Sequence, residues 1–250
     1  TVSVLYWLYP SVPNSTMSGG GKKWFPLEAN PEVMTQYTRT LGVEKGCYFT
    51  DIFGLDDDLL AMVPQPVLAV VMLFPMTKEN DAAVDQAHAA FAKSGAPGGA
   101  TVPFFMKQTV SNACGTVGIV HAVTNNTDRV VLRPGGVLHR FLASTLESSP
   151  EERAAWFEND KELDKAQADA AQLGQTSNQD INAEINLHFI CLVSVAGTLY
   201  ELDGRKPAPL NLGACDQADL LKRAAARAKE YMAWNPNEVN FTLTAMVAEE

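Results

Sequence analysis

The longest uninterrupted apolar run in the chain is VLAVVMLF, which lies between Pro66 and Pro75. A run of this length that is rich in β-branched residues and bounded by turn residues is typical of a strand buried on both faces. We therefore expect it to form the centre of a sheet. Shorter apolar stretches predict four more strands, over residues 47–53, 186–195, 198–203 and 239–247.

Helices are indicated where capping residues precede an apolar periodicity. Asn30, Pro31 and Glu32 supply the N-cap, the first-turn proline and the first-turn acid of a helix, and Gly42 is suited to end it. Ser149 begins a similar cap, proline and acid series. Further helices are expected over residues 78–93, 114–123, 138–146 and 216–234, with a single helical turn over 56–62.

Residues 160–184, DKELDKAQADAAQLGQTSNQDINAE, contain no aromatic residue and few large apolar ones. A segment of this composition contributes little to a core, so we expect a mobile loop that crosses the surface. The loop would join a helix ending near Asn159 to the strand that carries His188. Its C-terminal end must therefore lie beside that histidine.

Length and charge limit the classes of function. With 250 residues, of which 46% are hydrophobic, the chain can bury a sizeable core as one domain. The formal net charge of -10 argues against a nucleic-acid or anionic-membrane surface and favours a basic partner. The apolar residues 1–10 lack a basic leading segment and are too few to span a bilayer, which needs about 20.

The four cysteines, Cys47, Cys114, Cys191 and Cys215, are widely scattered and show no paired metal-binding spacing. We therefore expect reduced thiols, as in cytosol or nucleus, with no disulfide, no structural zinc and no cofactor. Cys47 and Cys215 have no recognisable base nearby in the sequence, and we interpret them as accessible, ordinary thiols.

Cys114 stands out because it begins a predicted helix. Ser111 and Asn112, both capping-type residues, precede it, and Gly115 and an apolar run follow. In a first helical turn the unpaired N–H groups and the helix dipole favour an anion, so a thiolate there is stabilised over the thiol. Gln108 lies upstream, where its amide can fold back beside the backbone N–H of Cys114 and supply two donors to an oxyanion.

A base for this thiol follows from the predicted hairpin. If Ala196 and Gly197 form a two-residue turn, cross-strand partners have numbers that sum to 393, as Val195 with Thr198 does. His188 then lies opposite Arg205, with Asp203 as a diagonal neighbour on the same face, about 7 Å away between Cβ atoms. The geometry predicts a His188–Asp203 hydrogen bond.

The alternative for His188 is a hydrogen-bonded structural histidine. The rival base, His121, follows Cys114 by seven residues in the same predicted helix, which puts it about 10 Å further along the axis and out of reach. Cys191 lies on the opposite, core-packed face of the hairpin and is expected to be a core thiol. His88 and His139 are expected to face solvent.

Three segments, FFMKQTVSNACGTVGIVHAV, LHFICLV and LYELDGRKP, resemble ubiquitin C-terminal hydrolases, a family of papain-like cysteine peptidases. The resemblance is strongest to the short single-domain members and runs from about Trp24 to the last predicted strand. It implies an α/β (α+β) fold, with a central, mainly antiparallel sheet flanked by helices and an entangled backbone. It also implies a single catalytic domain over residues 17–250, preceded by a disordered extension, residues 1–16.

The family carries its catalytic residues in the order Gln, Cys, His, Asp, which Gln108, Cys114, His188 and Asp203 match. The resemblance therefore implies a thiol hydrolase that cleaves small adducts or peptides from the C-terminal glycine of ubiquitin through a Cys114 thioester. It implies a monomer, without nucleic-acid or membrane partners, in the cytoplasm and also the nucleus. Two alternatives stay open: a ubiquitin-binding or storage protein with little turnover, and a hydrolase for another ubiquitin-like modifier.

The resemblance further implies a ubiquitin-binding surface. The family segments that border this surface match Pro26, Leu27, Glu28, Ala29, Asn30, Pro31, Gly174, Gln175, Thr176, Val239, Asn240 and Phe241. Residues 160–184 are expected to pass over the Cys114 cleft and to limit the size of the leaving group. The alternative is an inert surface insertion.

Overall fold

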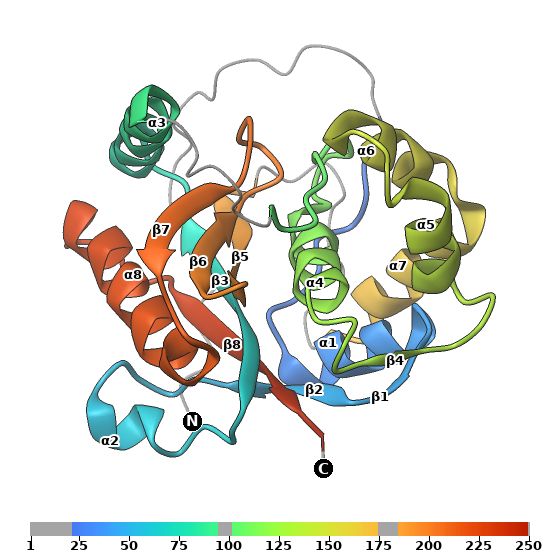
Figure 1. Ribbon diagram of the computed structural model, residues 1–250, viewed down its shortest axis with the longest axis horizontal. Coiled ribbons are helices and arrows are strands. Elements are labelled where there is room, and N and C mark those ends of the chain that lie inside the picture. The colour runs from blue at the N-terminus through green and yellow to red at the C-terminus, as the bar shows by residue number, and fades with distance from the viewer. Residues whose placement is uncertain (1–21, 95–101, 175–184, 250) are drawn as a thin grey trace.

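A six-stranded antiparallel sheet runs through the centre of the protein (Figure 1). The structure is a computed structural model and describes residues 22–94, 102–174 and 185–249. The strand order is β2-β8-β3-β5-β6-β7. The strands are β2 (Cys47–Asp51), β3 (Val67–Pro75), β5 (Leu187–Val195), β6 (Thr198–Leu202), β7 (Leu210–Ala214) and β8 (Thr242–Ala248), and β1 (Val43–Lys45) and β4 (Val131–Leu132) form a separate pair.

Helices cover both faces of this sheet, as Figure 1 shows. Two hydrophobic cores result, one on each face. The predicted α/β architecture, a mainly antiparallel sheet flanked by helices, is thus confirmed. The helices on one side are α1 (Pro31–Thr40), α4 (Cys114–Thr124), α5 (Val137–Thr145), α6 (Pro150–Asn159) and α7 (Lys161–Gln172), and those on the other are α2 (Asp57–Leu60), α3 (Lys78–Ser94) and α8 (Leu220–Trp234), the last preceded by a 3-10 turn (Gln217–Asp219).

Strand β3 is the centre of the sheet, as its apolar run predicts. It pairs with β8 on one side and with β5 on the other, and all of its residues are buried. Successive side chains enter opposite cores: Val71 packs in the first, Met72 and Phe74 in the second. Since burial of each such side chain contributes roughly 1.5–3 kcal/mol, this one strand ties the two helical layers together.

The predicted helix ends are confirmed where side-chain caps set them. The Asn30 side chain accepts hydrogen bonds from the backbone N–H groups of Glu32 and Val33, at 2.9 and 3.3 Å. Gly42, which follows α1, has a φ of 106°, a left-handed conformation that favours glycine. Ser149 and Glu152 form a reciprocal capping box at the start of α6.

The prediction of a loop over residues 160–184 is wrong for its first half, which forms helix α7. Asp160 caps this helix by accepting a hydrogen bond from the Leu163 N–H at 2.8 Å. Leu163, Ala166 and Ala170 are buried in the first core, where α7 packs beside α1. Small alanine side chains allow this close approach, so a helix with only one large apolar anchor still joins the core.

Other parts of the chain fall outside the predictions or outside the described residues. The short strands β1, β4 and β7 are not predicted, because β1 carries two charged residues, β4 has only two residues, and β7 contains asparagine and glycine instead of an apolar run. Residues 1–16 and 175–184 lie outside the described residues, so that after Gly174 the expected size filter is not described. Within the described ranges, no helix is both long and apolar enough to cross a membrane.

Candidate active site

The sheet and helix α4 bring the predicted site residues together at one end of the molecule. Helix α4 packs against β5 and β3, and Cys114 is its first residue. His188 is the second residue of β5, where it pairs with Phe74 of β3. Asp203 directly follows the last residue of β6, the neighbour of β5. Because β5 and β6 are antiparallel, the start of β5 and the end of β6 lie side by side at the same end of the sheet.

His188 and Asp203 form the predicted pair. The His188 Nε2 and Asp203 Oδ1 atoms are 2.7 Å apart, and only 2% and 5% of the two residues is exposed. The hairpin has the predicted register, with Cys191 opposite Leu202, but the expectation of Arg205 opposite His188 is wrong. The ladder ends at Leu202, and the chain turns so that the Arg205 backbone N–H donates to Asp203 Oδ1 at 2.9 Å.

Cys114 lies on the other side of the imidazole. Its thiol and His188 are hydrogen-bonded, and since Nε2 faces Asp203, we assign Nδ1 as the nitrogen that meets the sulfur. The backbone N–H groups of Gly115 and Phe189 also point at the sulfur. Cys114 is only half-buried, so a substrate can approach a nucleophile whose charged form already has donors.

The charges of the three side chains support one another. Burial alone would raise the pKa of the Cys114 thiol, but the hydrogen bond and charge of His188 lower it below its usual range. Burial would lower the pKa of His188, yet the carboxylate of Asp203 and then the Cys114 sulfur raise it to about 9. The carboxyl of Asp203 has its pKa lowered by His188 in spite of burial. The site therefore favours a thiolate beside an imidazolium.

Gln108 lies beside the first turn of α4, with its backbone bonded to the turn that follows Asp203. Its N–H donates to the Gly204 carbonyl at 2.9 Å, and its side-chain Nε2 donates to the Val110 carbonyl at 3.2 Å. The Gln108 Oε1 atom is buried without a hydrogen-bond partner. Nε2 has a second hydrogen, and this is the one available to a developing oxyanion.

The expectation that Ser111 and Asn112 cap this helix is wrong. The N-cap position is Ala113, and no side chain bonds to the first turn of α4. Asn112 instead adopts a φ of 62° and donates its side-chain amide to the Trp24 carbonyl at 3.0 Å. The consequence is favourable for anion binding, because the N–H groups at the helix start are not occupied by a cap.

Some of the predicted ubiquitin-binding residues lie close to the start of α4, and others lie at the end of the sheet that carries His188. Leu27 is buried against Gly115, so closely that a β-carbon on the glycine would lie 3.0 Å from the Leu27 Cβ. Glu28 contacts Gly174, and Asn30 caps α1. Val239–Phe241 precede β8 at the same sheet edge as His188, with Val239 83% exposed. Gln175 and Thr176 lie outside the described residues.

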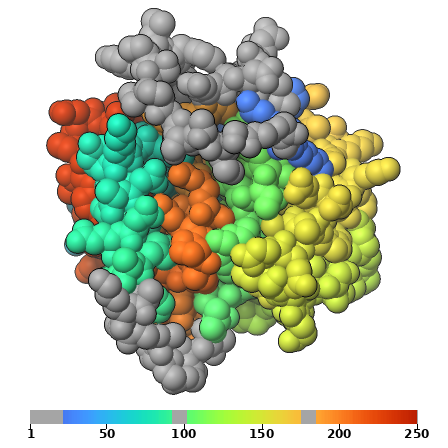
Figure 2. Space-filling view, turned by 90° about the horizontal axis from the view of Figure 1, so that it is seen from above, coloured from blue at the N-terminus to red at the C-terminus, as the bar shows by residue number. Residues whose placement is uncertain are grey.

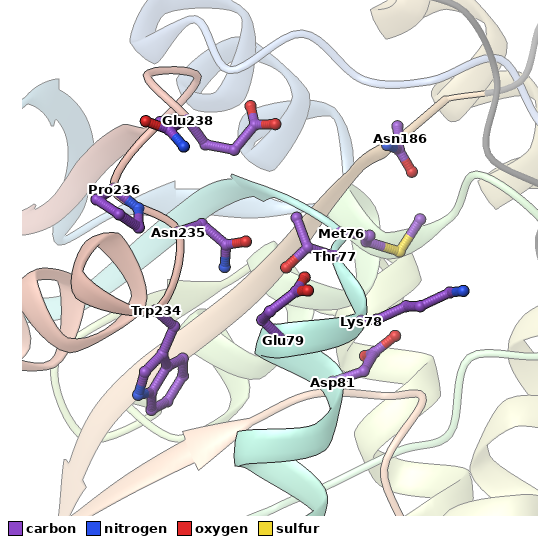
Figure 3. Close-up of a pocket in the computed structure, with 11 residues that line it drawn as sticks. Met76, Thr77, Lys78, Glu79, Asp81, Asn186, Trp234, Asn235, Pro236 and Glu238 are labelled. Atoms are coloured by element: carbon purple, nitrogen blue, oxygen red, sulfur yellow. The ribbon is translucent and has the colours of Figure 1, made fainter.

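A cavity of about 570 Å³ opens at this sheet edge (Figure 3). One wall comes from the junction of β3 and α3, which carries Met76 and Glu79, and the other from the end of α8 and the turn after it, which carries Trp234 and Glu238. Asn186, two residues before His188, closes one side. The backbone N–H of Met76 donates to the Asn186 carbonyl at 2.8 Å and links the cavity to the start of β5.

The remaining thiols are buried, and the prediction that Cys47 and Cys215 are accessible is wrong. They are 1% and 4% exposed, because each belongs to a hydrophobic core. Burial raises the pKa of Cys47 to about 11 and also raises that of Cys215. Cys191 is completely buried in the first core, as predicted. Cys114 is therefore the one cysteine with a lowered pKa.

The other histidines have separate roles. His121 is fully buried; its Nε2 accepts a hydrogen bond from the Met106 N–H at 3.1 Å, and its ring stacks on Phe105. Its Nδ1 is buried and has no hydrogen-bond partner among the described residues. His139 is exposed as expected, whereas His88 is half-buried, contrary to expectation, because α3 packs beside α8 and β7.

Comparison with known proteins identifies the family. Residues 24–233 match the family model described as ubiquitin carboxyl-terminal hydrolase, family 1. The chain belongs to this family. It is 43% identical over 233 residues to ubiquitin carboxyl-terminal hydrolase 3 of Arabidopsis thaliana, covering 92% of this chain and 96% of that protein. It is 41% identical to a ubiquitin carboxyl-terminal hydrolase of Drosophila melanogaster, covering 91% and 98%.

Solved structures show the same hydrolase fold. The catalytic domain of Trichinella spiralis UCH37 bound to ubiquitin vinyl methyl ester superposes with a TM-score of 0.70 at 22% identity, over 90% of this chain and 96% of that one. The family resemblance expected from the segments around Cys114, His188 and Asp203 is thus confirmed over most of the chain. Sequence reasoning missed the backbone N–H of Phe189 and the contacts of Gly204, since neither is encoded by a reactive side chain.

Proposed function

We propose that this protein is a cysteine-type ubiquitinyl hydrolase that releases small adducts or peptides from the C-terminal glycine of ubiquitin. The observation that carries the proposal is the continuous link from Cys114 through His188 to Asp203 at the open end of α4. The family membership and the name of its relatives supply the ubiquitin specificity.

The chemistry is acyl transfer in two halves. The Cys114 thiolate attacks the C-terminal carbonyl of ubiquitin, and the N–H of the α4 first turn and the Gln108 amide donate to the tetrahedral oxyanion. The His188 imidazolium gives its proton to the leaving group as the C–N or C–O bond breaks, which leaves a thioester. His188 then takes a proton from water, which attacks the thioester and restores the thiolate. Asp203 keeps the imidazole oriented and stabilises its charge.

A paired measurement tests the proposal. Cys114→Ala is expected to abolish release of a fluorescent group from the ubiquitin C-terminus while ubiquitin affinity stays within a few-fold of wild type, because the thiol supplies the covalent step and little contact area. Cys191→Ala, which removes a thiol from the core, serves as the matched control and should lose stability but retain turnover. Unchanged turnover in Cys114→Ala would exclude the assignment.

The same assay separates the two alternatives. A storage protein would bind ubiquitin without releasing the reporter, and a hydrolase of another modifier would release the reporter faster from that modifier than from ubiquitin. We further propose that the enzyme works as a monomer in the cytoplasm and nucleus, where reduced thiols persist. Light scattering of the purified chain and imaging of a tagged copy test these two points.

A further inference from the structure

Gly204 lies where three parts of the site meet. It follows Asp203 in the turn over residues 203–206, which is closed by a hydrogen bond from the Lys206 N–H to the Asp203 carbonyl at 2.9 Å. Its own carbonyl accepts the backbone N–H of Gln108. In the space-filling view of Figure 2, the segments that contain these residues, orange for the turn and green for the approach to α4, lie side by side.

A second contact fixes the same two segments to each other. The side-chain amine of Lys107 donates to the carbonyl of Lys206, at the other end of the turn. Lys206 is in turn held by Asp85 of α3, with the amine and carboxylate 2.8 Å apart. The turn that presents Asp203 to His188 is thus also the support on which Gln108 rests.

The contact at Gly204 is so close that a side chain there would have to displace its neighbours by a few tenths of an ångström. A β-carbon at this position would lie 3.0 Å from both the backbone nitrogen and the Cβ of Gln108, and 3.1 Å from Cγ1 of Val117 in α4. The φ of Gly204 lies outside the left-handed region, so backbone conformation does not explain the glycine. The requirement is for space. Because the nearest atoms include the backbone of Gln108, an added methyl group cannot be relieved by rotation of a side chain.

The Gln108 side chain makes this spacing important. Its Oε1 is a buried acceptor without a partner, and its Nε2 holds only the Val110 carbonyl. An unpaired buried acceptor costs free energy, and in a native protein it calls for an explanation such as a catalytic role. Because the Gln108 amide makes so few hydrogen bonds, its direction depends on where the backbone places the Gln108 Cβ. This is one of the atoms that a β-carbon at Gly204 would crowd.

We propose that Gly204 is a positioning residue that sets the place of the Gln108 amide at the oxyanion. The inference rests on the proposed hydrolase function. Gly204 affects the reaction through Gln108 and not through Asp203, because Asp203 is held separately by hydrogen bonds to His188 and to the Arg205 N–H. A displacement of the donor by a few tenths of an ångström to one ångström weakens transition-state binding and leaves thiolate formation intact.

Gly204→Ala tests this with two readouts. We expect kcat on a ubiquitin C-terminal reporter to fall by roughly 10- to 100-fold with KM little changed, since the oxyanion exists only in the transition state. Alkylation of Cys114 by iodoacetamide, including its pH profile, should stay as in wild type because it needs no oxyanion donor. In a Gln108→Ala background, Gly204→Ala should cause no further loss. Gly118→Ala, whose new methyl group meets only Val71 and Phe189 at ordinary distances, is the control and should keep its activity.

Several outcomes would overturn the proposal. If the losses of kcat in Gly204→Ala and Gln108→Ala multiply in the double variant, the two residues act independently. If the pH profile of Cys114 alkylation shifts in Gly204→Ala, Gly204 acts through His188 or Asp203. If Gly204→Ala does not fold, Lys107→Met removes the neighbouring contact without adding volume; it should lower kcat several-fold, again with no added effect in Gln108→Ala. Retained wild-type kcat in Lys107→Met would then reject the proposal. Failure of the hydrolase function itself is distinguishable, because wild type would then release no reporter.

Discussion

Asp203 reaches His188 from one residue beyond the end of β6, across a gap of 2.7 Å between Oδ1 and Nε2. The carboxylate is thus held by a turn instead of the sheet ladder, and the Arg205 N–H shares the same oxygen. Because two N–H groups donate to the same buried Oδ1, the orientation of the Asp203 carboxylate is fixed. The carboxylate in turn fixes the orientation of the His188 imidazole.

Asp203→Asn is therefore expected to keep the fold and lose rate, by roughly 10²- to 10⁴-fold in kcat. An amide can present its N–H to Nε2 and favour the wrong imidazole tautomer. It also removes the charge that raises the pKa of His188, so the alkaline limit of Cys114 alkylation should move below pH 9. Asp128→Asn, which alters an exposed carboxylate that pairs with Arg129 away from this turn, is the control. Equal pH profiles for Asp203→Asn and wild type would contradict this role.

The pH dependence of Cys114 itself is a second prediction. Its pKa is lowered from the ordinary value of 9.0, so alkylation by iodoacetamide should begin at a lower pH than for a free thiol. A second change is expected about pH 9, when His188 loses its proton and the ion pair is lost. His188→Gln removes the group that lowers the thiol pKa, and burial then dominates. The reaction at pH 7 should therefore slow, because each unit by which the thiol pKa rises lowers the thiolate fraction tenfold.

Mass spectrometry of the alkylated protein provides the internal control for that experiment. Cys47, Cys191 and Cys215 are buried and have raised pKa values, so they should stay unmodified while the protein is folded. Modification of any of them at a rate near that of Cys114 would show that the environment described for the nucleophile is not distinctive.

The sequence predicts the chemistry of this site better than its surroundings. The register of a two-residue hairpin follows from residue numbers alone, and the structure has a φ of 49° at Ala196 and 75° at Gly197, as such a turn requires. That register is sufficient to place His188 near Asp203. The predicted register does not continue beyond Leu202, because nothing in the sequence shows where β6 ends and the turn toward Gly204 begins.

Packing between distant segments accounts for the other errors. Helix α7 was interpreted as a loop because its alanines carry little apolar area, yet they fit closely against α1. Cys47 was expected to be accessible because it begins a strand, whereas β2 lies under α1 and pairs with β8. The contacts that decide these two cases, α7 with α1 and β2 with β8, join segments more than a hundred positions apart in the sequence. Local periodicity does not specify such neighbours.

His121 provides a prediction for acid stability. Burial lowers its pKa to about 4 from 6.5, so the folded protein keeps this imidazole neutral. Above pH 6.5 the imidazole is neutral in both the folded and the unfolded chain, so it does not change stability. As the pH falls from 6.5 toward 4 the unfolded chain takes up the proton first, and the free energy of unfolding decreases. The loss amounts to about 3 kcal/mol over that window. His121→Gln keeps an acceptor for the Met106 N–H and should remove this slope in urea-unfolding measurements between pH 4 and 6.5.

His139→Gln provides the control for that measurement, because it makes the same substitution at an exposed site. Asp203 contributes in a separate window, because its lowered pKa affects stability only below about pH 4, as its carboxylate becomes protonated. A His121→Gln slope equal to that of wild type would mean that His121 is protonated in the folded state.

The last prediction concerns a buried charge cluster behind the sheet that no local sequence pattern indicates. Glu201, in β6, is 1% exposed and lies against α8, where it accepts hydrogen bonds from Arg227 Nε at 2.7 Å and from the Tyr231 hydroxyl at 2.8 Å. Arg227 also stacks near the rings of Tyr231 and Trp234. The cluster connects α8 to β6, the strand that directly precedes Asp203.

Removing one partner leaves the other charge buried and unpaired. Glu201→Leu should therefore cost about 3–5 kcal/mol of the free energy of unfolding, and Arg227→Met a similar amount. The double variant, which buries no lone charge, should lose far less than the sum of the two, a coupling that a double-mutant cycle in urea measures directly. Because the Tyr231 ring meets Phe74 edge to face, and Phe74 pairs with His188, reporter turnover of the folded double variant shows whether this support extends to the active site. Additive losses would mean that the two charges are stabilised independently, by the Tyr231 hydroxyl for Glu201 and by Glu230 for Arg227.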